Sequence, residues 1–248
     1  MSERVKRLQR RARLAVGLLL HPTMILRRLR HGPVYQRALR YANLWREVRI
    51  LKPRRIVEIG VWRGITASRL IEEGLNARGE VEYWGFDLFA EGMTPDILAL
   101  ESAIQPLSRD ETLARLERPG ANIHLVEGDT KITLAQTDVP PADLIFIDGG
   151  HSYETVASDW ANVQRFLHPD SVVYFDDYTN EVGERRGYGI RRLVDSIDRS
   201  KWEVQLLEPA DSYRMPEGLQ ETRFARVSRR KARNGRPEIQ PFSSTAVR

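Results

Sequence analysis

The chain alternates short apolar segments with stretches of helical periodicity, and this alternation limits its fold more than any other feature. Short apolar runs favour buried strands, and apolar residues three or four positions apart favour helices. The predicted strands are 55–59, 81–86, 123–127, 144–147, 171–175, 202–207 and 224–227, and the predicted helical regions are 66–73, 95–116, 153–167 and 190–197. Strands that alternate with helices predict an α/β fold with a doubly wound, mainly parallel sheet.

Length and composition fit one large domain with an added segment at each end. The 248 residues are 41% hydrophobic, which allows a sizeable core. We predict a basic helical segment over 1–45, a domain over 46–228 and a basic, disordered tail over 229–248. The domain is expected to hold a seven-stranded, Rossmann-like sheet whose last two strands form an antiparallel edge. Cys is absent, which excludes disulfides, thiolate zinc sites and cysteine nucleophiles.

Acidic residues follow four of the predicted strands. Asp87 ends the second strand, Asp129 follows the third, Asp148 follows the fourth, and Asp176 and Asp177 follow the fifth. Buried strands need no acid for folding, so these residues are candidates for chemistry. In an open α/β sheet, ligands bind in the crevice beyond the carboxyl ends of the strands. The sequence therefore predicts a ligand site at this edge of the sheet.

The positive charge of the chain is placed at its two ends. The formal net charge is +5, yet residues 1–55 hold roughly 16 Lys and Arg against two acids, and the tail from 229 holds about six against one. The middle of the chain is therefore acidic. We expect no nucleic-acid partner, because the basic residues lie outside the domain core.

The N-terminal segment contains an apolar run over 14–20 between arginines. The run is far shorter than the roughly 20 residues that a membrane-spanning helix needs, and it lacks the cleavage site of an export signal. A basic amphipathic helix over 4–30 could lie on an anionic membrane surface, or it could pack on the domain or on a partner subunit. We expect a cytoplasmic protein, with peripheral contact at the inner membrane surface and a homo-oligomer left open.

A glycine turn follows the first predicted strand. Glu58, Gly60 and Gly64 define this turn, which leads into a helix. A dinucleotide-binding turn would have the spacing G-x-G-x-x-G, whereas Glu58 stands here at the first glycine position. An acid disfavours a diphosphate and suits a ligand that carries an amine and a sulfonium. The two glycines could instead do no more than shape a tight turn.

The glycine turn resembles the first motif of the class I S-adenosylmethionine-dependent methyltransferases, whose glycines contact the aminoacyl part of the cofactor. The resemblance implies that Asp87 binds the ribose and that Gly128, Asp129 and Thr130 meet the adenine. Each acid alone could equally cap a helix. Three acids at successive strand ends favour the cofactor reading.

A second resemblance covers about residues 55–200. The residues that carry it are the segment 146–153 (FIDGGHSY), Asp159 and Trp160 on the following helix, and the segment 173–178 (VYFDDY). Together they resemble the macrocin O-methyltransferase-like group, which includes enzymes that act on antibiotic sugars. This resemblance implies that Asp148, Asp176 and Asp177 hold a divalent metal, usually magnesium. It also implies that Asp148 and His151 take part in catalysis, with His151 as the base.

The chemistry of these residues agrees with that implication. Magnesium prefers octahedral oxygen ligands, and three carboxylates leave positions for two substrate hydroxyls. A histidine nearby could take the proton of a metal-bound alcohol. An isolated histidine is more often structural and an Asp-Asp pair often forms a turn, but no other histidine of the chain has the acidic glycine context of His151.

The sequence thus predicts a metal-dependent O-methyltransferase that uses S-adenosylmethionine and a sugar, glycoconjugate or other small-molecule diol. The alternative is an inactive cofactor-binding module that scaffolds a membrane-associated assembly through its basic N-terminal helix. The loops over 92–110 and 180–189 match no particular acceptor. Arg185, Arg186 and Tyr188 could gate the site or contact an anionic substrate, or they could be solvated loop residues.

Overall fold

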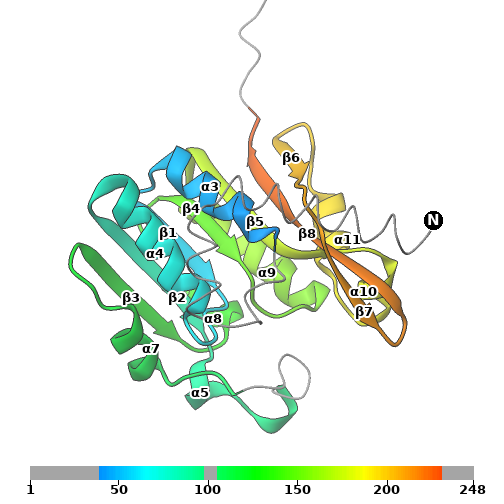
Figure 1. Ribbon diagram of the computed structural model, residues 1–248, viewed down its shortest axis with the longest axis horizontal. Helices are drawn as coiled ribbons and strands as arrows, with labels where there is room; N and C mark the ends of the chain where they lie inside the picture. Colours follow the sequence, from blue (N-terminus) through cyan, green and yellow to red (C-terminus); the bar gives the residue numbers. More distant parts are fainter. Residues whose placement is uncertain (1–38, 98–104, 231–248) are drawn as a thin grey trace, which may run out of the picture.

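The computed structural model describes residues 39–97 and 105–230, which form one eight-stranded sheet covered by helices (Figure 1). The strand order is β3-β2-β1-β4-β5-β8-β6, and β7 pairs with β8 outside this path. The strands are β1 (Arg55–Ile59), β2 (Val81–Asp87), β3 (Ala121–Glu127), β4 (Ala142–Ile147), β5 (Leu167–Thr179), β6 (Trp202–Leu206), β7 (Asp211–Met215) and β8 (Gly218–Arg229). Strands β1 to β5 pair in parallel, and β8 is antiparallel to β5, β6 and β7. The predicted doubly wound, mainly parallel sheet is confirmed.

Helices cover both faces of the sheet. They are α3 (Tyr41–Leu51), α4 (Ile65–Arg78), α5 (Phe89–Gly92), α7 (Arg109–Leu116), α8 (Thr130–Gln136), α9 (Tyr153–Val163), the 3-10 turn η2 (Gln164–Phe166), α10 (Glu181–Arg185) and α11 (Ile190–Ser196). Side chains of α3, α4 and α7 pack in one core with Ile56 of β1, while α8, α9 and α11 pack in the other with Val57 and Ile59. Successive residues of β1 face opposite layers because side chains alternate along a strand.

The sheet has one strand more than predicted. Strand β7 pairs with the beginning of β8 across the tight turn between Met215 and Gly218, and its sequence DSYRM has few apolar residues to mark it as a strand. The predicted helix over 153–167 ends earlier, at Val163, because the chain passes through η2 into β5 at Leu167.

Helix α3 belongs to the packed domain. Leu44, Trp45 and Val48 lie three or four residues apart and are all buried against the sheet layer that α4 also covers. The helix ends at Leu51, and Lys52, the C-cap, adopts a left-handed φ of 48° before Pro53. The predicted domain boundary at residue 46 therefore falls inside this helix, and the domain reaches at least to residue 39.

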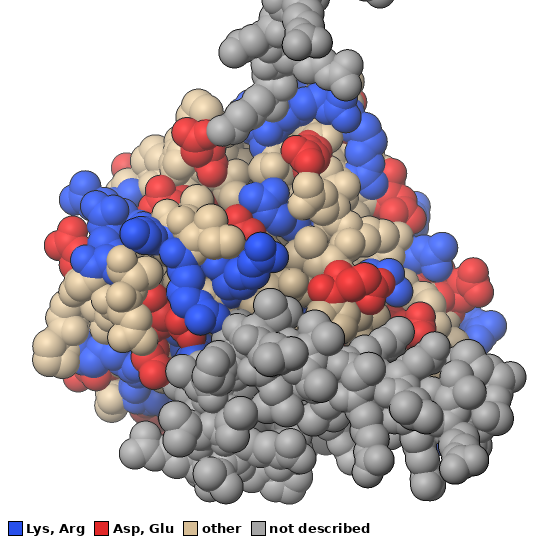
Figure 2. Space-filling model, turned by 45° about the horizontal axis from the view of Figure 1, so that its top comes forward, with Lys and Arg blue, Asp and Glu red and all other residues tan. Residues whose placement is uncertain are grey.

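The surface of the described residues carries both signs of charge. On the face shown in Figure 2, acidic and basic side chains are interspersed. No helix in the described part of the chain has the length and apolar character that crossing a membrane requires. The predicted membrane-contacting segment 4–30 and the tail beyond 230 lie outside the described residues.

Candidate functional site

The carboxyl ends of the parallel strands bring the predicted site residues to one edge of the sheet. Strands β2, β1, β4 and β5 are neighbours in that order. Residues 87, 60 and 148 stand at or just beyond the ends of the first three, and residue 176 follows the last residue of β5 that pairs with β4. Gly60 donates its N–H to the Phe86 carbonyl, and Asp148 donates to the Ile59 carbonyl, both in 2.8–2.9 Å hydrogen bonds. The strand ends are therefore tied to one another and not merely close.

The glycine turn is shaped by the protein backbone itself. Gly60 has a φ of +87°, and a Cβ added to it would lie 2.1 Å from the Asp148 carbonyl oxygen. Gly64 begins α4 with a φ of +68°. Both glycines are thus required by the local fold. Between them, Trp62 adopts a φ of 49° and leaves 37% of its surface exposed, a strained conformation of the kind that gathers at functional sites.

Glu58 is completely buried beneath this turn. The Tyr83 hydroxyl donates a hydrogen bond to Glu58 Oε2, and Oε1 has no hydrogen-bond partner. Burial raises the pKa of Glu58 to about 8, although the hydrogen bond from Tyr83 opposes the shift. The side chain therefore keeps an unused acceptor in a buried position.

Asp87, at the end of β2, is held by the backbone of the neighbouring turn. Its Oδ2 accepts hydrogen bonds from the N–H groups of Val61 and Trp62, both at 2.6 Å, and its Oδ1 accepts one from Phe89 at 2.8 Å. This carboxylate orders the turn and stands at the edge where a ribose is expected. Each oxygen of a carboxylate has more than one acceptor position, so these bonds leave capacity for a ligand.

The turn after β3 has the structure of a helix cap. Asp129 is the N-cap of α8, and its Oδ1 accepts the N–H of Lys131 at 2.9 Å. Asp129 therefore caps a helix, which is the alternative role that the sequence had left open for it. Gly128 has a φ of +131°, and Thr130 is the first residue of α8.

Asp159 of α9 is fully buried, and burial raises its pKa to about 6.

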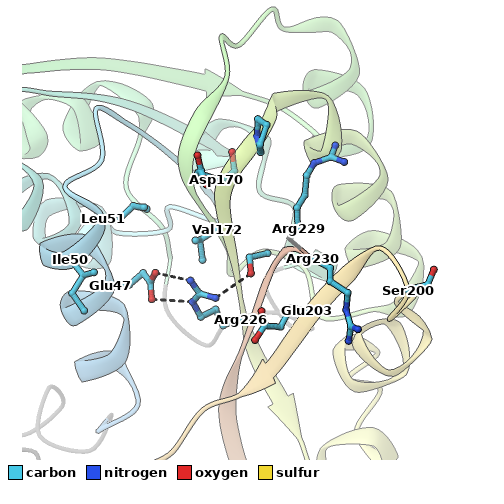
Figure 3. Close-up of a pocket in the computed structure, with 13 residues that line it drawn as sticks. Glu47, Ile50, Leu51, Asp170, Val172, Ser200, Glu203, Arg226, Arg229 and Arg230 are labelled. Atoms are coloured by element: carbon cyan, nitrogen blue, oxygen red, sulfur yellow. Dashed lines mark hydrogen bonds and ion pairs between the residues drawn. The ribbon is translucent and has the colours of Figure 1, made fainter. Parts of the chain in front are cut away.

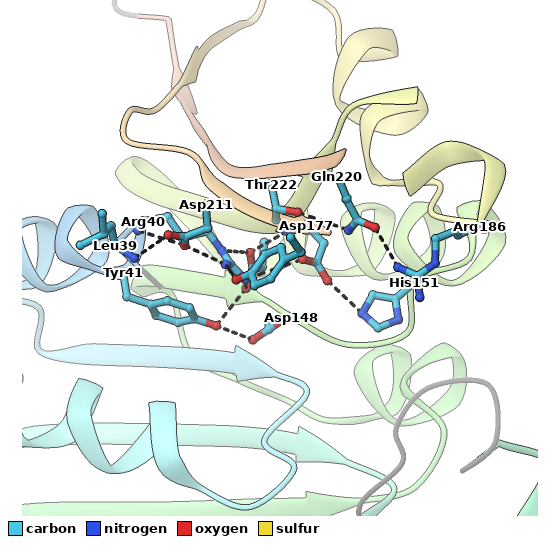
Figure 4. A network of polar contacts seen from close by, with 12 residues as sticks. Leu39, Arg40, Tyr41, Asp148, His151, Asp177, Arg186, Asp211, Gln220 and Thr222 are labelled. Atoms are coloured by element: carbon cyan, nitrogen blue, oxygen red, sulfur yellow. Dashed lines mark hydrogen bonds and ion pairs between the residues drawn. The ribbon is translucent and has the colours of Figure 1, made fainter. Parts of the chain in front are cut away.

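His151 and Asp177 form a direct pair. Nε2 of His151 lies 3.0 Å from Oδ2 of Asp177, and Figure 4 shows the imidazole pointing at that carboxylate. Burial acts to raise the pKa of Asp177, but the hydrogen bond from His151 and the charge of Arg40 outweigh it and hold this pKa below its usual value. Asp177 is therefore an ionised partner for the imidazole.

Asp176 and Asp177 lie inside β5, at a break in its pairing with β8. The register shifts between Phe175 and Tyr178, and Asp177 has a φ of 53°. The prediction had ended the strand at Phe175, whereas β5 continues to Thr179. A bulge of this kind turns side chains toward a site while the strand continues.

The loop over 180–189 packs against His151. The N–H of Gly189 donates to the His151 carbonyl at 2.8 Å, and the Tyr188 ring lies 4.5 Å from the imidazole between centroids. Arg186 donates to the Gln220 side chain at 2.8 Å, and Arg185 contacts the Glu217 carbonyl. Tyr188 and Arg186 thus border the site, and a role for them in gating it or in contacting a substrate stays a prediction.

Two residues from the start of α3 enter the same cluster. The guanidinium of Arg40 is bound to both oxygens of Asp176, at 2.7 and 2.9 Å, and lies 3.7 Å from Asp177. The Tyr41 hydroxyl donates to Asp176 Oδ2 at 2.9 Å and contacts Asp148 Oδ2 at 3.3 Å. Figure 4 shows both side chains reaching from α3 toward the strand ends.

Arg40 also joins this cluster to the β7–β8 hairpin. Its Nη1 donates to Asp211 Oδ2 at 3.0 Å and to the Tyr213 hydroxyl at 2.9 Å. Sequence reasoning missed Arg40, Tyr41 and Asp211. Arg40 is one of many basic residues near the N-terminus, and Asp211 lies in a strand without an apolar pattern, so no local signal marked them.

The predicted metal ligands Asp148, Asp176 and Asp177 do come together, but their arrangement does not fit a metal ion. The guanidinium of Arg40 takes both oxygens of Asp176, while Asp177 turns to His151. The Tyr41 hydroxyl lies between Asp176 and Asp148, and burial and the charges of the other two acids raise the pKa of Asp148 well above its usual value. Among the described residues, no group of three or more His, Cys, Asp or Glu side chains is placed to hold a metal. The predicted magnesium is not confirmed.

A hollow of the described surface lies elsewhere. It has a volume of about 1020 Å³ and is lined by Glu47, Val172, Arg226 and Arg229 among others (Figure 3). These residues surround the amino-terminal half of β5 and the end of β8, opposite the edge that carries the acids. Arg226 is paired with Glu47 by two hydrogen bonds. The candidate site is therefore assigned from the strand ends and not from this hollow.

One comparison with known proteins matches about half of the chain. A family described as a methyltransferase domain matches residues 57–178, just under half of the chain. This segment runs from the glycine turn to the residue after the Asp176–Asp177 pair and so contains both halves of the site. No curated protein matches the chain. The narrower resemblance to the macrocin group stays a prediction.

Solved structures share the fold at low sequence identity. An O-methyltransferase from Bacillus cereus in complex with S-adenosylhomocysteine is 17% identical, with a TM-score of 0.52 over 88% of this chain and 90% of that one. A methyltransferase from Podospora anserina, also bound to S-adenosylhomocysteine, is 16% identical, with a TM-score of 0.50 over 88% of each chain. The chain is thus similar to a methyltransferase domain over residues 57–178, and it shares the fold of these solved methyltransferases.

Proposed function

We propose that the protein is an O-methyltransferase that transfers the methyl group of S-adenosylmethionine to a hydroxyl of a sugar, a glycoconjugate or another small-molecule diol. The observation that carries the proposal is the pair of His151 and Asp177, 3.0 Å apart at the carboxyl edge of the sheet. Methyl transfer to an alcohol needs a base for the hydroxyl proton. A histidine held by an ionised carboxylate is such a base.

The residues at the edge suit the cofactor. S-adenosylmethionine offers hydrogen-bond donors at its ammonium, its ribose hydroxyls and its adenine amine. The chain presents acceptors along the same edge at the carboxylate of Asp87 and the turn at Asp129, and the partnerless Oε1 of Glu58 lies buried beneath the glycine turn. The cofactor-binding set that we propose is Glu58, Gly60, Gly64, Asp87, Gly128, Asp129 and Thr130.

The protein's own groups have definable tasks in this reaction. Bound S-adenosylmethionine supplies a methyl group on a sulfonium. Nε2 of His151 lies 3.0 Å from Oδ2 of Asp177, and the imidazole is the group that takes the hydroxyl proton. The low pKa of Asp177 keeps this carboxylate ionised while the imidazole carries the extra proton. Tyr188, packed on the ring, and the hydrogen bond from Gly189 to the His151 carbonyl hold the base in place.

Magnesium is not part of the proposal, because Arg40 and Tyr41 already engage the acids that would bind it. The diol acceptor rests on the resemblance to the macrocin group and on the polar rim of the site. Arg186 and Tyr188 border His151, and Asp148 lies under the same edge. These groups can donate to or accept from the hydroxyls of a sugar-like acceptor.

The test is formation of S-adenosylhomocysteine with a panel of sugars and diols, comparing the wild type with His151→Asn. We expect the variant to lose about two to four orders of magnitude in kcat and to keep its calorimetric affinity for S-adenosylmethionine. His168→Asn is a matched control, because His168 Nε2 lies 3.1 Å from Asp143 at the opposite end of the sheet. Equal turnover by wild type and His151→Asn would reject the base.

The same experiment distinguishes the proposed enzyme from the alternative function, an inactive cofactor-binding scaffold. A scaffolding module would bind S-adenosylmethionine and give no turnover with any acceptor. Failure of the folded wild type to bind the cofactor would refute both functions.

A further inference from the structure

The acids that the family resemblance implies as metal ligands already hold a cation that belongs to the chain. Arg40 lies 7% exposed between Asp176 of β5 and Asp211 of β7, and its guanidinium makes hydrogen bonds of 2.7 to 3.0 Å to both. A guanidinium presents its N–H groups in a planar fork that matches the two oxygens of a carboxylate. The pairing with Asp176 has that two-bond form.

We propose that Arg40 replaces the divalent metal in this protein: its guanidinium is the permanent cation among Asp148, Asp176 and Asp177, and it positions the base through them. This inference deepens the proposed function, because it concerns the same site. It assigns Arg40 a positioning role, since its hydrogen bonds go to protein groups.

A chain of contacts leads from Arg40 to the base. Arg40 Nε donates to Asp176 Oδ1. The same oxygen accepts the backbone N–H of Asp177 at 2.6 Å. Asp177 is thereby held at a φ of 53°, a conformation unfavourable for a residue with a Cβ, and its Oδ2 meets His151. Arg40 thus determines where the carboxylate beside the base is placed.

Tyr41 completes the replacement on the third acid. Its hydroxyl lies between Asp176 Oδ2 and Asp148 Oδ2, at 2.9 and 3.3 Å. The resemblance implies that both acids hold a metal, and in this structure a hydroxyl of the chain joins them. The cluster is thus closed by two consecutive residues of one chain segment, Arg40 and Tyr41, which act as a unit.

Charge balance favours the same conclusion. A buried group of acids needs positive charge nearby or must take up protons. Arg40 supplies one positive charge, within hydrogen-bonding distance of Asp176 and Asp211 and 3.7 Å from Asp177. A fixed cation within the chain therefore supplies positive charge where a divalent ion would otherwise supply it.

The test is metal binding, which needs no acceptor and no turnover. Full-length protein is titrated with Mn²⁺, and electron paramagnetic resonance measures the Mn²⁺ that stays free. Nuclear magnetic resonance then compares the paramagnetic broadening of the His151 imidazole signal with that of the His168 signal. We expect the wild type to show no selective broadening at His151. Arg40→Ala is expected to gain one site per chain that broadens His151, and Arg40→Ala with Asp177→Asn is expected to lose it.

Arg226→Ala is the matched control. Arg226 also makes two hydrogen bonds to one carboxylate, that of Glu47, but it lies on the other side of the molecule from His151. We expect this variant to bind Mn²⁺ no differently from the wild type. A gain of the same site in Arg226→Ala would overturn the assignment to Arg40.

Two further results would overturn the proposal. One is a stoichiometric Mn²⁺ site beside His151 in the wild type, and the other is a folded Arg40→Ala variant that gains no site. If Arg40→Ala does not fold, the wild-type titration decides alone. The readout is independent of methyl transfer, so failure to find an acceptor would reject the proposed function and leave this result standing.

Discussion

Arg40 and Asp176 are 136 positions apart in the chain and are joined by two hydrogen bonds, Nε to Oδ1 at 2.7 Å and Nη2 to Oδ2 at 2.9 Å. Only 8% and 2% of the two side chains are exposed. The pair links α3, at the beginning of the described chain, to the strand that carries the acids of the site. The candidate active site and the attachment of α3 to the sheet are therefore one structure.

The first prediction concerns stability. Arg40→Met removes the cation from two buried acids, and we expect it to lower the free energy of unfolding by about 3–5 kcal/mol. Arg226→Met breaks a two-bond pair that is more exposed, with side chains 21% and 15% exposed, and should cost about 1 kcal/mol or less. Urea unfolding of both variants measures the difference; equal costs would contradict the burial argument.

The second prediction isolates the close approach at the glycine turn. Gly60 and Gly79 have nearly the same φ, +87° and +88°, but a Cβ at Gly60 would meet the Asp148 backbone at 2.1 Å, whereas one at Gly79 would meet nothing within 4 Å. Gly79→Ala should cost about 1–2 kcal/mol from backbone conformation alone. Gly60→Ala should cost about 1–3 kcal/mol more. Thermal unfolding of the two variants tests the ranking, and a Gly60→Ala protein as stable as Gly79→Ala would show that the strand ends can separate freely.

The third prediction follows from the buried Glu58. Its pKa is raised from 4.5 to about 8 in the folded protein, mainly by burial. The folded state holds the proton more tightly than the unfolded state, so stability is highest below the unfolded pKa and falls as the pH rises toward about 8. The glutamine side chain of the Glu58→Gln variant cannot ionise. Its free energy of unfolding should therefore fall less steeply with pH than that of the wild type, by roughly 1 kcal/mol or more per pH unit. Urea unfolding of both proteins between about pH 5 and about pH 9 measures how the free energy of unfolding changes with pH. The same slope in the variant and the wild type would contradict the raised pKa of Glu58.

The fourth prediction concerns the partner of the base. Asp177→Asn keeps the size of the side chain and removes its charge, so a protonated His151 loses its stabilising neighbour. We expect kcat to fall by about two orders of magnitude or more, while the affinity for S-adenosylmethionine stays within a factor of about two, since Asp177 is not in the cofactor set. Steady-state kinetics and calorimetry provide the two readings. A selective loss of cofactor affinity would move Asp177 to the cofactor side of the site.

Several features of the fold could be predicted because they depend on local pattern. The strand ending at Ile147 and the glycine turn at Gly60 are marked by apolar runs and by the residues that follow them. The acids at 87, 148 and 176 reach one edge because parallel neighbours end at the same side of a sheet. Strand β7 and helix α10 were missed, since short elements with few buried residues leave little periodic signal.

The site itself was predicted only in part. His151 and Asp177 were expected to be close and are paired, whereas the partner of Asp176 was expected to be a metal and is Arg40 in this structure. Whether a carboxylate binds a metal or a guanidinium depends on which cation the folded chain places beside it. Here the packing of α3 places Arg40 beside Asp176, and the sequence interpretation had put the first residues of α3 outside the domain.

The amino-acid sequence alone determined the sheet and the placing of acids at the ends of its strands, because hydrophobic periodicity and turn residues act over a few neighbouring positions. Only the tertiary structure decided what those acids bind. Leu44, Trp45 and Val48 anchor α3 in the core, and this packing carries Arg40 and Tyr41 to the strand ends. Ion pairs between distant segments follow from such packing, which no local pattern in the chain encodes.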